Sequence, residues 1–213
     1  MKILMMTAVE AEQEAVIGGI GNTLNIDVAV AGVGPAKAAA RTAFVLGKTE
    51  YDLVMSAGIA GGFKKRAGIG DIVISERLIA AELGADAQKG FIPIDELGFG
   101  SNVIHADHQT VDRLSARLVE ANQVVRTGSI LTLSTVTGSE EKAAALMQRF
   151  PYAQAEAMEG FGVATAAKEK NLPVLEIRAI SNEIGPRDKG KWEIKEALAQ
   201  LEKASASIAE VLE

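Results

Sequence analysis

The fold of this chain is decided by residues 154–180, which read QAEAMEGFGVATAAKEKNLPVLEIRAI. The pattern predicts a short strand over Gln154–Met158, a helix over Gly160–Asn171 and a buried strand over Pro173–Ile180. A strand, a helix and a second strand in succession form the unit from which parallel sheets are built. The stretch therefore predicts an α/β fold.

The same alternation continues through the rest of the chain. Apolar runs predict strands at 2–7, 25–30, 51–57, 72–79 and 123–134, and longer segments of helical period predict helices at 10–20, 35–46, 106–122, 139–150 and 193–212. Residues 80–101 have scattered Gly, Pro and aromatic residues without a clear period, so we expect an irregular excursion there. Because no repeat or linker interrupts the pattern, we expect residues 1–213 to form one domain, with a mainly parallel central sheet flanked by helices.

The composition excludes several classes of protein. The 213 residues include no cysteine, which excludes disulfide scaffolds, Cys-ligated metal sites and thiol catalysis and fits a reducing cytoplasm. The net charge is −6 and no basic run occurs, so a nucleic-acid surface is not expected. No apolar stretch reaches the roughly 18 residues of a membrane helix. We therefore expect a cytoplasmic protein that binds neither nucleic acid nor membrane.

Polar groups follow the predicted strands at the positions where open α/β sheets bind ligands. They are Glu10 and Glu12, the glycines of 58–62, Glu159, and the pair Ser181-Asn182. Each also has a structural interpretation, since acids in a first helical turn complement the helix dipole. The glycine cluster resembles a phosphate cradle but lacks the Lys-Ser/Thr of a P-loop, which excludes that motif.

The two histidines are weak candidates for a metal site. His105 and His108 are three residues apart, and only carboxylates could complete a site with them. We favour surface histidines, and we expect neither a metal nor another cofactor.

Three separate pieces of the chain carry a resemblance to one family. They are MKILMMTAVEAE at the start, SAGIAGGF with GIGDIVIS in the middle, and AEAMEGFGVATAAKEKNLPVLEIRAISNEIG at 155–185. In this order they resemble the purine nucleoside phosphorylase and methylthioadenosine/S-adenosylhomocysteine nucleosidase superfamily. The resemblance implies cleavage of the N-glycosidic bond between a purine and a ribose, on a mixed, partly closed sheet flanked by helices.

The resemblance also implies roles for individual residues. The water-activating carboxylate falls on Glu12, and the ribose-binding Met and Glu fall on Met158 and Glu159. Arg178 matches a residue that helps to hold the attacking water, and Ala60-Gly61 match the backbone that lines the base and the sugar.

Two positions depart from the nucleosidase pattern. The purine-stacking aromatic is replaced by Val136, counted without gaps back from Glu159, and the base-protonating Asp is replaced by Asn182. Ser181 accompanies Asn182 as a substrate-binding candidate. A 6-oxopurine presents two adjacent acceptors, N7 and O6. An amide NH₂ can donate to them, whereas a carboxylate cannot. Asn182 therefore favours hypoxanthine nucleosides over adenine nucleosides.

The nucleophile is expected to be water. Phosphorolysis needs cations beside the sugar, whereas the first strand ends among acids and no arginine precedes Arg41. Inward folding of Arg41 or Arg66 is the alternative arrangement that would admit phosphate.

Within the superfamily, the tail NEIGPRDKGKW at 182–192 looks most like futalosine hydrolases. The resemblance implies release of hypoxanthine from futalosine, in a route to menaquinone. Futalosine carries an aromatic acid on the 5′ side of its sugar, for which Arg187, Lys189 and Lys191 are candidate partners. A solvated loop explains these charges equally well, and we expect Trp192 to pack against the last helix.

Two alternatives stay open at this point. One is an adenine-directed methylthioadenosine/S-adenosylhomocysteine nucleosidase, and the other is a purine nucleoside-binding protein that has lost catalysis. Related enzymes usually form dimers or larger homo-oligomers in which one subunit closes its neighbour's pocket. Residues 80–105 are our candidate for such a lid.

Overall fold

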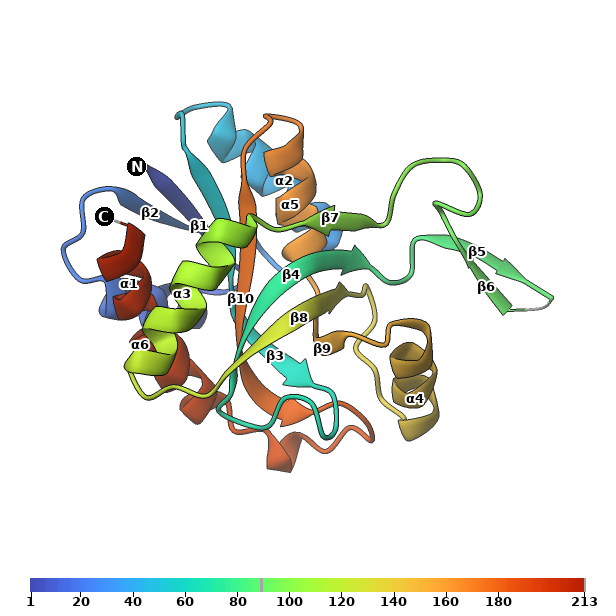
Figure 1. Ribbon diagram of the computed structural model, residues 1–213. Helices are drawn as coiled ribbons and strands as arrows, with labels where there is room; N and C mark the ends of the chain where they lie inside the picture. The colour runs from blue at the N-terminus through green and yellow to red at the C-terminus, as the bar shows by residue number, and fades with distance from the viewer. Residues whose placement is uncertain (89, 213) are drawn as a thin grey trace.

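The computed structural model, which describes residues 1–88 and 90–212, is built around one twisted sheet with helices on its faces (Figure 1). The strands of this sheet are β1 (Ile3–Thr7), β2 (Ile26–Val30), β3 (Leu53–Gly62), β4 (Ile72–Ala80), β7 (Val103–His105), β8 (Val125–Thr132), β9 (Ala153–Ala157) and β10 (Val174–Glu183). The helices are α1 (Glu10–Ile20), α2 (Pro35–Leu46), α3 (His108–Glu120), α4 (Glu140–Arg149), α5 (Gly160–Lys168) and α6 (Ile194–Leu212), with a 3₁₀ turn at Lys189–Lys191.

The sheet is partly closed because β10 pairs on both of its sides. Its order is β10-β4-β8-β9-β3-β1-β2, and β10 also pairs with β3, so five strands form a ring from which β1 and β2 extend. Most pairings are parallel, while β10–β4, β3–β9 and β4–β7 are antiparallel. The expected α/β class, with a mixed, mainly parallel and partly closed sheet, is confirmed.

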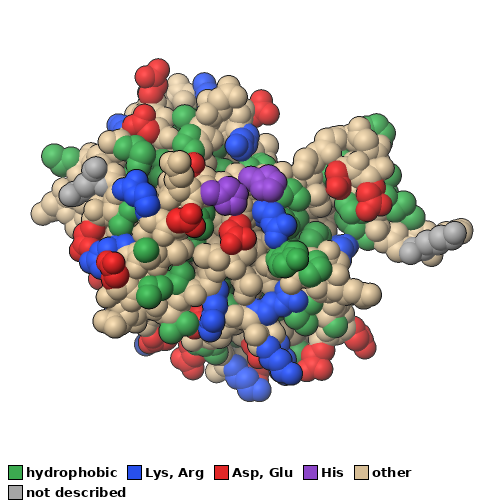
Figure 2. Space-filling model, viewed as in Figure 1, with side chains coloured by type: hydrophobic (Ala, Val, Ile, Leu, Met, Phe, Trp, Pro, Cys, Tyr) green, Lys and Arg blue, Asp and Glu red, His purple; other side chains and the backbone are tan. Residues whose placement is uncertain are grey.

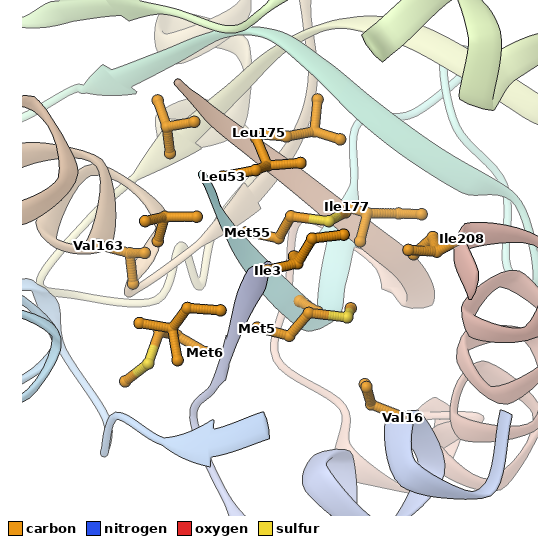
Figure 3. Close-up of a cluster of buried hydrophobic side chains, with 14 of the residues drawn as sticks. Ile3, Met5, Met6, Val16, Leu53, Met55, Val163, Leu175, Ile177 and Ile208 are labelled. Atoms are coloured by element: carbon orange, nitrogen blue, oxygen red, sulfur yellow. The ribbon is translucent and has the colours of Figure 1, made fainter. Parts of the chain in front are cut away.

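The core lies between the sheet and its two groups of helices (Figure 3). All five residues of β1 are buried, as are Leu53 and Met55 of β3 and Leu175 and Ile177 of β10. Strands covered on both faces need such continuous apolar runs, which explains why these segments lack a polar alternation. Helices α1, α3 and α6 pack together on one side of the sheet, and α2 packs against α5 on the other (Figure 1).

Two strands run further than the sequence predicts. The strand expected to end at Ala57 before a glycine turn continues through Gly62. The prediction is wrong because Gly58, Gly61 and Gly62 lie inside the strand. Each lacks a side chain so that atoms of neighbouring residues can pack directly against the strand backbone. A Cβ at Gly58 would lie 2.5 Å from both Arg178 Nη1 and Glu12 Oε1. Likewise β10 passes Ile180 and includes the pair Ser181-Asn182.

The segment predicted as irregular contains regular structure. Strands β5 (Gly84–Ala87) and β6 (Gly90–Pro93) form an antiparallel hairpin that projects from the body of the molecule (Figure 1). Strand β7 then pairs with β4. The hairpin was missed because the faces of its strands are not buried, so its sequence carries no apolar alternation.

The helix predicted over 106–122 is α3, and Asp107 caps it by accepting a hydrogen bond from the Thr110 N–H at 3.0 Å. His105 and His108 are both exposed, as expected, and lie together on the face shown in Figure 2. Within the described residues, no group of three or more His, Cys, Asp or Glu side chains could hold a metal ion. Nor does this part of the chain contain a helix that is long and apolar enough to cross a membrane.

Gly162 should be essential to the contact between α5 and α2. A Cβ at this position would collide with the backbone carbonyl of Pro35, in the first turn of α2. At a solvent-exposed position inside a helix, Gly→Ala stabilises the protein by about 1 kcal/mol. Here overpacking against backbone should outweigh that gain, so Gly162→Ala is expected to lower the free energy of unfolding by about 1–3 kcal/mol.

Urea denaturation measures this change. Gly138→Ala is the control, because a Cβ there meets nothing within 4 Å. Its effect should stay within about 0.5 kcal/mol. A Gly162→Ala protein as stable as the parent would contradict the packing role.

Candidate active site

A pocket of about 290 Å³ lies where β1, β3, β9 and β10 meet the helices that follow β1 and β9. Most of the residues expected at a site line it, namely Glu12, Ala60, Gly61, Val136, Met158, Glu159, Ser181 and Asn182. Elements separated by more than 100 residues in sequence thus contribute to one cavity. Of the two acids after the first strand, Glu10 is exposed and does not line this pocket, whereas Glu12 is buried.

The carboxylate of Glu12 is held by backbone donors at the junction of β1 and α1. Its Oε2 accepts from the Ala8 N–H at 2.8 Å and from Val9 at 3.3 Å, and its Oε1 accepts from the Ile59 N–H at 2.9 Å. Only 4% of the residue is exposed. Burial raises the pKa of Glu12, and the charge of Arg178 together with these backbone donors opposes the rise. The result is a fixed carboxylate with more basicity than one in water.

Glu159 connects the beginnings of two helices. Its Oε1 accepts from the Gly34 N–H at 3.2 Å, just before α2, and its Oε2 accepts from the Met158 N–H at 3.3 Å, just before α5. Donors at a helix N-terminus, together with the helix dipole, favour a negative charge there. Glu159 is therefore an oriented carboxylate at the pocket wall rather than a simple helix cap.

Arg178 lies behind both carboxylates and is fully enclosed. The guanidinium, 1% exposed, donates to Glu176 Oε1 at 2.9 Å, to Ser56 Oγ at 3.0 Å and to Glu159 Oε2 at 3.4 Å. Burial works against its charge, but the carboxylates of Glu176, Glu159 and Glu12 outweigh burial and raise the pKa of Arg178. Arg178 does not line the pocket but lies behind the carboxylates that do.

Glu176 belongs to this cluster although no sequence pattern singles it out. It is completely buried on β10, and its Oε2 has no hydrogen-bond partner among the described residues. Burial raises the pKa of Glu176, and Arg178 opposes that rise. Its carboxylate lies against Gly160, where a Cβ would collide with both oxygens. Gly160 therefore leaves room for the partner of Arg178.

Asn182 reaches the pocket through an irregularity in β10. The register of β10 against β3 shifts between Ile180 and Asn182, so Ser181 is an extra residue. The Ser181 hydroxyl lies 3.2 Å from the Ala60 carbonyl and 2.9 Å from Asn182 Oδ1. Asn182 Nδ2 donates to the Glu183 carbonyl at 3.1 Å, which leaves its second N–H available. The bulge thus lets two successive residues face one cavity.

The pocket wall also includes Glu156, which sequence reasoning missed, and Arg187 with Trp192, of which Arg187 was a sequence candidate. Glu156 on β9 lines the pocket with only 6% of its surface exposed, and its Oε1 accepts from the Thr137 N–H at 2.7 Å. On the β10 side, the guanidinium carbon (Cζ) of Arg187 lies 5.8 Å from the centre of the Trp192 ring, and both residues line the pocket. Trp192, expected to pack against the last helix, is thus part of the cavity wall. An acid inside a short strand otherwise looks like a surface residue, which explains the omission of Glu156.

Other sequence candidates lie elsewhere. Arg41 is exposed beside Phe44, and Arg66 donates to the Ala153 carbonyl at 2.8 Å; neither lines the pocket. Lys191 pairs with Asp188 at 3.4 Å, and the side chain of Lys189 lies outside the described parts of the structure. Within the lid candidate, residues 80–105, no described residue lines this pocket.

The comparison with known proteins decides the family. The model of a family described as the phosphorylase superfamily matches residues 7–213. The chain belongs to the phosphorylase superfamily. A futalosine hydrolase from Streptomyces coelicolor is 46% identical over all of this chain and 97% of the relative. A futalosine hydrolase from Acidothermus cellulolyticus is 42% identical over 98% of this chain and 90% of the relative.

Solved structures of the superfamily share the fold. A 5′-methylthioadenosine/S-adenosylhomocysteine nucleosidase from S. pneumoniae, solved with a transition-state inhibitor, covers the whole of both chains with a TM-score of 0.85 at 22% sequence identity. The solved structure bears on the fold alone, whereas the family model and the two futalosine hydrolases confirm the resemblance found in the sequence.

In this member of the phosphorylase superfamily, we expect Arg178 to contribute strongly to the free energy of unfolding, because it balances the charges of the carboxylates at the pocket wall. Arg178→Met leaves three buried carboxylates without their cation, which should cost about 3–5 kcal/mol of unfolding free energy near neutral pH. Without Arg178 the folded-state pKa values of Glu176 and Glu12 rise further above their unfolded values. The cost should therefore be small below about pH 4 and grow as pH rises through the folded pKa values.

Denaturation at several pH values tests this dependence. Arg117→Met is the matched control, because Arg117 pairs with Glu210 at the surface, where its side chain is 32% exposed. Such a pair contributes about 0–1 kcal/mol. An Arg178→Met cost that does not vary with pH would argue against the charge-balancing role.

Proposed function

We propose that this chain is an N-glycosyl hydrolase of 6-oxopurine nucleosides, which converts futalosine to hypoxanthine and dehypoxanthinyl futalosine in a route to menaquinone. The identity of 46% and 42% to two futalosine hydrolases over nearly the whole chain supports the reaction. The observation that carries the specificity is the carboxamide of Asn182 in the same pocket as Glu12 and Glu159.

We assign Glu12 the activation of water. Cleavage of a ribosyl bond builds oxocarbenium character on the sugar, and a carboxylate near the anomeric carbon can orient and deprotonate water. Three backbone donors fix Glu12 in one orientation, and its raised pKa makes it a better base than an exposed carboxylate. Proton abstraction of this kind typically contributes about 10²–10⁴-fold to the rate.

Glu159 and Met158 are the proposed ribose contacts. The carboxylate of Glu159 can accept hydrogen bonds from two sugar hydroxyls, while Met158 offers an apolar surface beside it. Arg178, which contacts Glu159 directly and does not line the pocket, is assigned the positioning of the carboxylates. The resemblance assigns it to the attacking water instead, and that prediction stays open.

The base is proposed to lie between Ala60-Gly61 and Val136, with its N7 and O6 toward Asn182. A Cβ at Gly61 would lie 2.8 Å from Ile184 Cγ1 and 3.3 Å from Asn182 Nδ2, so the absence of a side chain there lets Ile184 and the amide approach the strand. The available N–H of Asn182 suits the two adjacent acceptors of a 6-oxopurine. Val136 offers apolar contact where the nucleosidases have an aromatic ring, and Ser181 holds the amide oxygen of Asn182.

Water rather than phosphate is the proposed nucleophile. Among the described residues that line the pocket, Arg187 is the one cation, and it lies at the rim with Trp192. Phosphate beside Glu12 and Glu159 would be repelled without a compensating arginine. Arg187 is instead our candidate for the carboxylate on the 5′ side of futalosine, with Trp192 beside the aromatic ring.

The remaining attributes are part of the same proposal. Residues 1–213 act as one domain that needs no cofactor or metal, in the cytoplasm, and assemble as a dimer or larger homo-oligomer. The match of the superfamily model to residues 7–213 supports the single domain, and the absence of cysteine fits a reducing cytoplasm.

A substrate panel tests the reaction and the base preference together. The purified protein is incubated with futalosine, inosine and methylthioadenosine, and the free base is followed. We expect hypoxanthine to be released faster than adenine, and Asn182→Asp to shift this ratio toward adenine by about 100-fold. Faster release of adenine by the parent protein would favour the methylthioadenosine nucleosidase alternative, and binding without turnover would favour the non-catalytic one.

Glu12 can be tested against a neighbour of the same charge. Glu12→Gln should keep nucleoside binding but lose about 10²–10⁴-fold in kcat, because the amide cannot accept the proton. Glu10→Gln, in the same helical turn but exposed, should stay close to the parent. Since burial raises the pKa of Glu12, kcat/KM of the parent should fall with decreasing pH at a value above the usual carboxylate pKa of about 4.3. Equal rates for the Glu12→Gln variant and the parent would remove Glu12 from the mechanism.

A further inference from the structure

Glu156 is a buried acid with one free oxygen inside the pocket. Its Oε1 accepts from the Thr137 N–H at 2.7 Å, while its Oε2 has no hydrogen-bond partner among the described residues. A buried acceptor without a partner costs about 1–3 kcal/mol unless a ligand satisfies it. Because Glu156 lines the cavity, a ligand in the pocket can reach that oxygen.

The sheet register places Glu156 opposite Asn182 across a glycine. Gly61 of β3 pairs with Glu156 of β9 on one side and with Asn182 of β10 on the other. Residues paired across neighbouring strands point to the same face, and adjacent strands lie about 4.8 Å apart. All three residues line the pocket. Gly61 therefore separates a carboxylate from a carboxamide by about two strand spacings, and the Ile184 side chain packs over Gly61 between them.

We propose that Glu156 accepts the N1–H of a 6-oxopurine and is, with Asn182, a specificity-determining residue. The inference rests on the proposed function and extends it to the second edge of the base. A 6-oxopurine has acceptors at O6 and N7 and a donor at N1, on the other side of O6. Asn182 supplies its one available N–H to the O6 and N7 edge, and Glu156 supplies an acceptor to the N1–H. Adenine has a lone pair at N1, which a carboxylate repels.

The chemistry requires a carboxylate at position 156 rather than an amide. One oxygen is occupied by the Thr137 N–H, so the N1–H needs the second oxygen as an acceptor too. A carboxamide has a single acceptor oxygen. In either orientation its NH₂ would face another donor, either the Thr137 N–H or the base N1–H.

The surroundings of Glu156 agree with this role. Burial raises the pKa of Glu156. The nearby Thr137 hydroxyl, which has no hydrogen-bond partner among the described residues, the Thr137 N–H and the charge of Lys142 oppose the rise, and Glu82 adds to it. A bound N1–H would likewise favour the ionised carboxylate. Burial also removes competing water, so a mismatch at this edge leaves polar groups unpaired.

The experiment compares the parent, Glu156→Gln and a control, Glu141→Gln, which removes an exposed charge on α4. Rates are measured at about pH 8 with inosine and with 1-methylinosine, which has no N1–H. For Glu156→Gln we expect kcat/KM for inosine to fall about 100-fold and that for 1-methylinosine to change by less than about threefold. Glu141→Gln should change neither rate. Equal losses on both substrates, or no loss, would overturn the proposal.

Binding of free bases separates this inference from the proposed reaction. If the parent hydrolyses neither nucleoside, the reaction is wrong, and calorimetry with hypoxanthine and 1-methylhypoxanthine still tests Glu156. The parent should bind hypoxanthine at least about tenfold more tightly, and Glu156→Gln should lose that preference. Equal affinity of the parent for the two bases would contradict the role of Glu156, and this measurement does not require the variant to fold.

Discussion

The pocket depends on one buried guanidinium placed among three carboxylates. Arg178 faces Glu176, Glu159 and Glu12 from the centre of β10, and without it burial would raise the pKa values of Glu176 and Glu12 further. A buried charge is tolerated when it is paired and hydrogen-bonded, and the described contacts of Arg178 meet that condition. Several small residues follow from this arrangement: a Cβ at Gly58 would meet the guanidinium, and one at Gly160 would meet the Glu176 carboxylate.

The same cluster couples the site to the packing of the helices. Glu159 accepts from Gly34 before α2 while it precedes α5, and these two helices touch where Gly162 meets Pro35. The carboxylate proposed for the sugar is thus positioned by the contact of two helices as well as by Arg178. A change in the packing of α2 against α5 would therefore move the donor to Glu159 Oε1, so the position of this carboxylate depends on the packing of the two helices.

The sequence predicts most of this fold because helix and strand periods differ. The buried strands β1, β3 and β10 are recognisable as apolar runs. It fails where polar or small residues face inward. In Leu175–Ala179 the acid and the arginine alternate with apolar residues, a pattern typical of a solvent-exposed strand face, yet in a partly closed sheet that face encloses the site. Glu176 and Glu156 were missed for this reason. The glycines of β3 were interpreted as a turn because their function, close approach of Arg178 and Glu12, is a long-range contact that no local pattern records.

Two buried carboxylates each have an oxygen without a hydrogen-bond partner in the described structure, and their surroundings give them different consequences. Glu176 is enclosed between Arg178 and Gly160, so the cost of its burial can be relieved only by the guanidinium or by a proton. Glu156 lines a cavity, so a ligand with a donor can relieve its cost. An unsatisfied group that a ligand can satisfy contributes to affinity and to selectivity at once, because a ligand without the matching donor leaves the penalty in place. The row from Glu156 through Gly61 to Asn182 offers one free acceptor oxygen at one end and one available N–H at the other, which complements a base with a donor at N1 and acceptors at O6 and N7.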